Sequence, residues 1–359
     1  MGITSCVFAC EGLLKMNSSD DSSSERCLFL EIPLHQTSLS SHLITATCVL
    51  NSLTIIPSVL GSAIILITMW GNPNLEFPSH VYLFCLALAD FVTGLIVQPC
   101  YVIHKTAWLL GHRKLDCIAR LLTETVAWIS AAASCVMIST ISLDRFLAVR
   151  LHMRYSIYMT RSRAIKYVVY ILVSLTLISC SRYWASDNRP FVIIGVCGIL
   201  SSVVTVVAAY LYIFAVLRRH KRKISAQNVC TSVSNGSENN ASDIQSKVTR
   251  RSAVSLAYVV GLFVVTYVPF VGALIVGLVQ GSVHNPSIAY DVTRTIVFTS
   301  SVLDPVIYCW KIPDVYVEVK KTWRNLRANV CPGSTDRNDN QATGVENFSV
   351  STQRTAGNS

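Results

Sequence analysis

The stretch TISLDRFLAVR, from Thr140 to Arg150, puts an acid and two arginines at the end of a long apolar segment. The segment begins near Ile118, so it exceeds the about 20 residues that a helix needs to cross a bilayer. Charged side chains directly after such a segment mark the place where a membrane helix leaves the bilayer. The stretch predicts a membrane protein and raises the question of what Asp144 and Arg145 do there.

The composition of the whole chain also favours a membrane protein. Of its 359 residues, 52% are hydrophobic and 14% are charged, whereas about a quarter are charged in an ordinary soluble domain. Seven apolar stretches are long enough to span a bilayer. They are residues 42–70, 81–104, 118–149, 164–183, 190–217, 253–279 and 288–310. We therefore predict an all-α membrane protein with a bundle of seven transmembrane helices.

The net charge of +10 is concentrated in particular connections. Lysines and arginines crowd the connection between the third and fourth spans, the one between the fifth and sixth, and the segment after the seventh. Because basic residues favour the cytoplasmic side, the N-terminus is expected outside the cell and the C-terminus inside. This distribution explains the charge without nucleic acid, so no nucleic-acid partner is expected.

The segments around the spans are polar. Residues 1–41 are expected to form a flexible extracellular tail that is glycosylated at Asn17, within an Asn-Ser-Ser sequon. Inside the seven-span domain 42–310, residues 219–250 have a basic start, a polar centre and a basic finish. That composition predicts a long disordered cytoplasmic loop.

The segment after the last span alternates apolar and basic residues at helical spacing. It predicts an amphipathic helix over residues 311–327, with Pro313 in its first turn, lying on the lipids of the inner membrane face. Residues 328–359 are expected to be a disordered cytoplasmic tail. Cys331 in this tail is either palmitoylated or a free thiol.

Four short motifs follow one another along the spans: LALAD at 86–90, LDRF at 143–146, FVVTYVP at 263–269 and DPVIY at 304–308. They resemble the second-helix, DRY, FxxCWxP and NPxxY motifs of rhodopsin-like (class A) G-protein-coupled receptors, and the resemblance covers all seven spans. The third helix has Arg120 where a cysteine is usual, and the fifth span lacks its usual proline. In these departures the chain is most similar to the group with melanocortin, lysophospholipid, cannabinoid and adenosine receptors.

The resemblance implies a receptor in the plasma membrane that activates heterotrimeric G proteins, with arrestin as a further partner. Arg145 is then masked in the inactive state, with Asp144 beside it, until the sixth helix pivots at Pro269. The alternative is an ordinary juxtamembrane charge that fixes the orientation of the helix. Thr249 and Ala253 offer no acid near the inner end of that helix, so agonist-free signalling is expected. The activation residues that the resemblance implies are Asp144, Arg145, Tyr212, Phe263, Tyr267, Pro269 and Tyr308.

A second set of residues matches the family's sodium pocket: Asp90, Ser134, Ser301 and Asp304. Asp90 lies in mid-span, where an ionised carboxylate is unfavourable unless it is paired or bound to a cation. Asp304 is expected beside it, and two close carboxylates share a proton or bind a cation. We predict a sodium or proton site coupled to activation. A hydrogen-bonded packing cluster without an ion is the alternative.

The outer half departs from two familiar ligand patterns. Ala127 and Trp128 stand where amine receptors place their aspartate, and Phe298 stands where opsins carry the retinal lysine. Both departures argue against those ligands. Glu124 precedes Arg145 by 21 residues, about 31 Å of helix, and is expected near the extracellular mouth.

Arg294 lies ten residues, about 15 Å of helix, before Asp304 and favours an acidic ligand group. The alternative pairs Arg120 with Glu124, and Asp291 with Arg294, each on a single helix. The ligand is expected to be a small molecule, a lipid or a peptide. The predicted ligand pocket consists of Glu124, Trp128, Tyr267, Phe270, Tyr290 and Arg294, with the aromatic side chains as its wall.

Other classes of function have less support in the sequence. No nucleophile–base set or HExxH motif occurs, so no catalytic residue is assigned and no enzyme is expected. The thirteen cysteines show no CxxC spacing, and sodium at Asp90 is the one ion expected. The main alternative is a ligand-independent or non-signalling seven-pass protein. A transporter ranks behind it, because no inverted repeat is visible.

Overall fold

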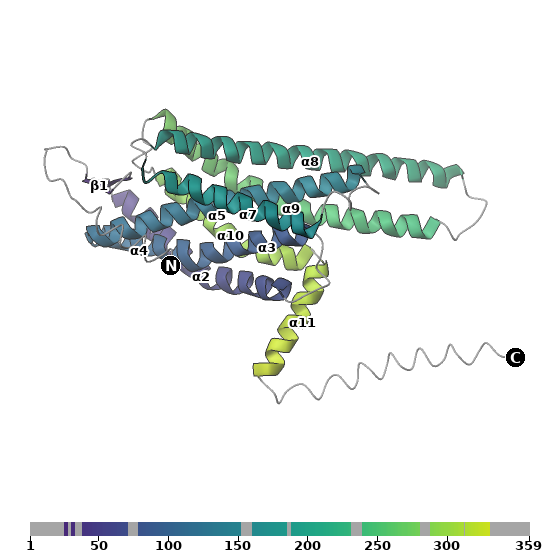
Figure 1. Cartoon of the computed structure of the whole chain (residues 1–359), viewed down its shortest axis with the longest axis horizontal. Coiled ribbons are helices and arrows are strands. Elements are labelled where there is room, and N and C mark those ends of the chain that lie inside the picture. Colours follow the sequence, from purple (N-terminus) through teal and green to yellow (C-terminus); the bar gives the residue numbers. More distant parts are fainter. Residues whose placement is uncertain are drawn as a thin grey trace.

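The computed structural model describes residues 25–27, 30–32, 38–70, 78–151, 160–184, 188–230, 239–280, 288–311 and 313–330. Long helices lie side by side in one bundle, and α11 leaves it at an angle (Figure 1). The bundle contains α2 (Ser38–Trp70), α3 (Pro78–Val92), α4 (Gln98–Leu109), α5 (Arg113–Leu151), α7 (Arg161–Ser181), α8 (Arg189–Cys230), α9 (Asn239–Val279) and α10 (Ile288–Lys311). The π-helix η1 (Thr93–Val97) joins α3 to α4, so these three elements form one span.

Among the described residues, six helical segments are long and apolar enough to cross a membrane, and they match the first six predicted spans. The seventh span is α10, with 24 residues. It carries the charged residues Asp291, Arg294 and Asp304, and all three are buried. Their side chains are therefore directed into the bundle and away from lipid, as intramembrane charges require. The predicted all-α seven-helix bundle is confirmed.

The third span, α5, lies against α3, α4, α7 and α8, while α10 lies against α2 and α9. Apolar side chains fill the spaces between them, and Leu86, Met137 and Val206 are fully buried. Leu53 and Tyr170 are instead exposed on the outside of the bundle, where lipid would cover them. We call the end of the bundle where α5 finishes the Arg145 end, and the opposite end, where α5 and α10 begin, the Arg294 end.

The helices at the Arg145 end extend further than the sequence predicted. α8 continues to Cys230 and α9 begins at Asn239, so most of the predicted loop 219–250 is helical. The sequence RRHKRKISAQ after the apolar part of α8 is rich in Arg, Lys, Ala and Gln. These residues favour helix, which explains why the helix continues beyond the span.

The predicted flexible tail, residues 1–41, contains two short strands and the start of the first helix. Within it, β1 (Glu25–Cys27) and β2 (Leu30–Ile32) pair antiparallel, with Arg26 opposite Glu31. The first span starts at Ser38, a few residues earlier than predicted. Part of the segment that was expected to be a flexible tail is therefore a short hairpin.

The helix predicted over residues 311–327 is α11 (Pro313–Val330), which begins two residues and ends three residues later than predicted. It packs against α2 and α10. Val317 and Trp323 are exposed on it, while Lys321 pairs with Glu318 at 2.8 Å. Exposed apolar side chains beside basic ones suit the surface of a membrane.

Candidate functional site

The second span changes register at η1, and this positions the residues of α4. The Gln98 N–H bonds to the Thr93 carbonyl five residues earlier, as in a π-helix. Gly94 permits the close approach of α2 here, because a Cβ at this position would lie 2.8 Å from Ser58 Oγ. The extra residue in the turn rotates the following helix, and α4 buries a face that includes Lys105.

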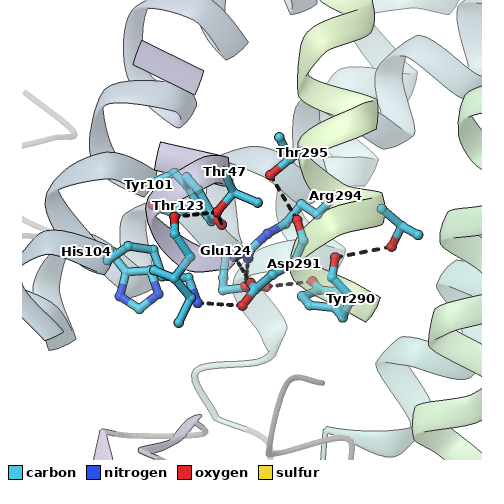
Figure 2. A network of polar contacts seen from close by, with 12 residues as sticks. Thr47, Tyr101, His104, Thr123, Glu124, Tyr290, Asp291, Arg294 and Thr295 are labelled. Carbon is cyan, nitrogen blue, oxygen red and sulfur yellow. Dashed lines mark hydrogen bonds and ion pairs between the residues drawn. The ribbon is translucent and has the colours of Figure 1, made fainter. Parts of the chain in front are cut away.

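A buried chain of ion pairs connects three helices at the Arg294 end (Figure 2). Lys105 of α4 donates to Asp291 of α10 at 2.7 Å, and Asp291 accepts from Arg294 at 2.9 Å. Arg294 also donates to Glu124 of α5. All four side chains are at most 10% exposed. We call Lys105, Asp291, Arg294 and Glu124 the charge quartet; its two acids balance its two bases.

Aromatic rings and hydroxyls complete the surroundings of the quartet. The Arg294 guanidinium lies 4.8 Å from the centre of the Tyr101 ring and 5.0 Å from that of Tyr290, which suits cation–π contacts. The Tyr290 hydroxyl donates to Glu124 at 3.3 Å, and the Tyr101 hydroxyl shares a hydrogen bond with Thr47 at 3.0 Å (Figure 2). Arg294 is thus enclosed by two carboxylates and by aromatic faces.

The structure shows how these charges are paired. The expected pairing of Asp291 with Arg294 on one helix is present, but Glu124 forms its ion pair across helices with Arg294. Arg120, its expected partner, is an electrostatic neighbour of Glu124. The interhelical pair could not be read from spacing along a single helix.

Sequence analysis missed several polar side chains at this end. Lys105 was overlooked because the second span was ended at His104, whereas the helix runs to Leu109. His104 itself is buried and contacts Asp116 of α5. A signal existed: ionisable residues next to an apolar span are buried in the bundle more often than they face lipid.

A layer of aromatic side chains lies next to the quartet. The ring of Trp128 is 6.2 Å from that of Phe270, which is 5.7 Å from that of Tyr290. Phe191 of α8, which the sequence analysis did not include, packs on Trp128 at 5.1 Å. Three members of the predicted aromatic wall are therefore contiguous, whereas Tyr267 stacks on Phe263 at 4.7 Å, nearer the middle of the bundle.

The four predicted ion-pocket residues all line one polar cavity in the middle of the bundle: Asp90, Ser134, Ser301 and Asp304. The cavity measures about 20 Å³, enough for a water molecule or a small ion. Ser301 is a neighbour of Asp90, whose Oδ2 has no hydrogen-bond partner among the described residues. Tyr267 and Phe263 border the same cavity, so it touches α9, the helix that is expected to pivot, as well as both carboxylates.

At the Arg145 end, the arginine is held by two neighbours. Arg145 donates from Nη2 to Ser79 of α3 at 2.8 Å, and its Nε lies 4.0 Å from the carboxylate of Asp144. Asp144 is buried. Tyr212, one of the predicted activation residues, stacks on Phe146 at 4.8 Å and is partly exposed.

Some predicted site residues fall outside what the structure describes. Asn17 and Cys331 lie outside the described ranges, and the side chain of Tyr308 is outside them as well. The same holds for the side chains of Thr249 and Ala253. Pro269 lies within α9, as expected for the pivot.

Comparison with known proteins agrees with this architecture. The family described as "7 transmembrane receptor (rhodopsin family)" matches residues 61–191 and 177–308. Trace amine-associated receptor 1 of Mus musculus is 25% identical over 295 residues, which cover 74% of this chain and 84% of that receptor. Histamine H2 receptor of Cavia porcellus is 25% identical over 275 residues, 71% of this chain and 72% of that receptor.

These comparisons do not test the similarity to the melanocortin group, which stays a prediction. The family match extends from the first span to the DPVIY motif, and so includes the charge quartet, the polar cavity and Arg145. The bundle, the order of its motifs and the length of the match lead to one conclusion. The chain belongs to the rhodopsin family of seven-transmembrane receptors.

Proposed function

We propose that this chain is a plasma-membrane receptor that binds an extracellular ligand at the Arg294 end and activates heterotrimeric G proteins at the Arg145 end. The N-terminus is then extracellular and the C-terminus cytoplasmic. The observation that carries the proposal is the position of Arg145, which ends the third span of a rhodopsin-family bundle and is held by Ser79 and Asp144. An ordinary juxtamembrane charge that fixes orientation would explain the position of Arg145 alone, and the family match favours the role in activation.

Activation is a shift between two conformations of the bundle. Agonist and G protein each favour the open state, in which α9 pivots at Pro269 and Arg145 becomes accessible. Among the described residues, neither side-chain contact of Arg145 is a close ion pair, because Ser79 is neutral and the carboxylate of Asp144 is 4.0 Å away. The restraint on the arginine is therefore weak, which supports the proposal of agonist-free signalling. Arrestin would bind the same open face.

The polar cavity supports a sodium ion as an allosteric modulator. Asp90 and Asp304 would supply two carboxylates, and Ser134 and Ser301 two hydroxyls, within a cavity of suitable size. The unbonded Oδ2 of Asp90 is an acceptor that a cation would satisfy. A sodium ion here would favour the inactive packing of the helices, and we expect Asp90→Asn to abolish any effect of sodium on signalling.

Three further assignments follow from the proposed orientation. Asn17 is the proposed glycosylation site, Cys331 a palmitoylation site, and α11 the contact with membrane lipids. The exposed Trp323 and the basic Lys321 on α11 support the lipid contact.

An amine ligand held in the manner of amine receptors has no support in this bundle, although both relatives are named for amines. Ala127 carries no charge, and Trp128 is packed between Phe191 and Phe270. A Cβ on Gly195 would lie only 2.6 Å from the Trp128 ring, so the indole fills its space completely. The ligand must find its charge partner elsewhere.

Agonist-independent cAMP and G-protein dissociation in cells test the proposal. The wild type is compared with Arg145→Ala and Asp90→Asn at matched surface levels. We expect a basal signal in the wild type that Arg145→Ala removes. Equal signals from the wild type and Arg145→Ala would reject the proposed role of the Arg145 end and favour a ligand-independent or non-signalling protein.

A further inference from the structure

The Glu124–Arg294 pair is the link of the charge quartet that joins α5 to α10, and each member has another partner. Arg294 keeps its bond to Asp291 at 2.9 Å if Glu124 departs, and Glu124 keeps the hydroxyl of Tyr290 at 3.3 Å. Breaking this link therefore leaves neither group alone. Lys105 and Asp291 remain paired throughout. The link can be exchanged for another contact without dismantling the cluster.

The charges around Glu124 decide which kind of ligand could make that exchange. Three guanidinium groups act on its carboxylate, those of Arg294, Arg182 and Arg120, and they outnumber the one neighbouring acid, Asp291. Arg182 lies at the same end, where it donates to Asn188 at 3.0 Å. An ammonium group that approached Glu124 would meet this positive field, whereas an acid that approached Arg294 would be attracted by it.

Arg294 has a hydrogen-bond donor that is not used by the described residues. Its Nε is buried and has no hydrogen-bond partner among the described residues, although both terminal nitrogens are bonded to carboxylates. A guanidinium presents a planar fork that binds carboxylates and phosphates through two donors. An acid that took the place of Glu124 would accept from Nη1, whereas the Nε–H points to the Nη2 side of the guanidinium and could bind a second acceptor there.

We propose that Glu124 is an internal stand-in for the acidic group of the ligand. The ligand is an anion, with a carboxylate or phosphate that displaces Glu124 from Arg294 and an apolar body that packs on the aromatic layer of Trp128, Phe270 and Tyr290. This inference rests on the proposed receptor function. It adds the chemical class of the ligand and a mechanism for its entry, because opening the Glu124 link releases α5 from α10.

The proposal predicts opposite effects for the two members of one ion pair. In Glu124→Gln the competitor is weakened, so a larger fraction of molecules has Arg294 free. The apparent affinity for an acid rises in proportion to that fraction, and we expect a gain of about tenfold or more. In Arg294→Gln the anchor is gone and the acid no longer binds. If the ion pair were purely structural, both substitutions would weaken the binding of the acid.

The experiment measures the thermal stabilisation of the purified full-length receptor in nanodiscs by defined probes. These are 3-phenylpropionate and phenyl phosphate as acids, phenethylamine as the matched amine, and phenylalanine as the zwitterion. Asp116→Asn is the control, because it removes a buried acid from the same end that is paired with His104. We expect the acids to stabilise the wild type, and to stabilise Glu124→Gln at lower concentration. The concentration needed in Asp116→Asn should equal that in the wild type. The two acids distinguish a carboxylate ligand from a phosphate ligand.

Three results would overturn the proposal. The first is stabilisation by the amine in the wild type that is lost in Glu124→Gln, and the second is stabilisation by phenylalanine alone that is lost in both variants. The third is that no acid stabilises the protein at millimolar concentration. If Glu124→Gln fails to fold, Glu124→Asp keeps the charge on a side chain one methylene shorter, which reaches Arg294 less well, and a gain in acid affinity is still required. Binding is read without G protein, so failure here is distinct from failure of the signalling proposal.

Discussion

Replacing Asp291 by asparagine should destabilise the bundle more than any other single change in the charge quartet. Asp291 accepts from Lys105 at 2.7 Å and from Arg294 at 2.9 Å, and it is buried. Asparagine keeps the shape but leaves two buried cations to share Glu124. Breaking a buried ion pair costs about 3–5 kcal/mol. We expect about 3 kcal/mol, because Lys105 retains a weak contact with the Tyr101 ring, 5.8 Å from its centre.

The assay is thermal unfolding of the purified receptor in nanodiscs, with a second substitution as an internal test. Lys105→Met in the Asp291→Asn background removes the stranded ammonium, so the double variant should regain more than half of the lost stability. Glu318→Gln breaks an ion pair of the same i,i+3 spacing on α11, where Lys321 is 56% exposed, and should cost less than about 1 kcal/mol. The reasoning is refuted if Asp291→Asn is as stable as the wild type, or if the second substitution gives no recovery.

Two other predictions concern packing and the restraint on the Arg145 end. Gly195→Ala forces a Cβ to within 2.6 Å of the Trp128 ring and should lower stability by about 1–3 kcal/mol in the same assay. The control Gly198→Ala, which has no atom within 4 Å of the new Cβ, should leave stability unchanged. Equal effects of the two substitutions would show that the ring can move aside. Ser79→Ala removes the 2.8 Å hydrogen bond to Arg145 and should raise basal G-protein dissociation a few-fold at matched surface level. A hydrogen bond to a charged group is worth about 1.5–3 kcal/mol, and the partial exposure of the Arg145 side chain lessens this value. An unchanged or lower signal would contradict this restraint.

The sequence predicted the bundle well because its signals are local. Apolar stretches long enough to span a bilayer located all seven helices, and DPVIY and LALAD predicted that Asp90 and Asp304 would meet in one cavity. Apolar and basic residues at helical spacing predicted α11 to within three residues at each end. Such signals depend on residues that are adjacent or one helical turn apart, so a single chain displays them.

The contacts that depend on three helices could not be predicted in this way. The pair of Glu124 with Arg294 joins residues 170 positions apart, and spacing within each helix favoured other partners. Lys105 enters the quartet because η1 adds a residue to the turn and rotates α4, and no composition rule predicts where a π-helix forms. The lengths of α8 and α9 were also underestimated, because polar residues outside the membrane were assigned to a loop although their helix propensity is high.

The most direct test of the receptor assignment is nucleotide exchange on purified G proteins. The full-length protein in nanodiscs is mixed with a panel of purified heterotrimers, and GTPγS uptake is compared between the wild type and Arg145→Ala with no ligand added. Our account predicts accelerated exchange on at least one heterotrimer with the wild type and none with Arg145→Ala, since Arg145 lies at the end of the bundle that we propose meets the G protein. Exchange that is equally fast with both proteins, or absent with every heterotrimer, would contradict it.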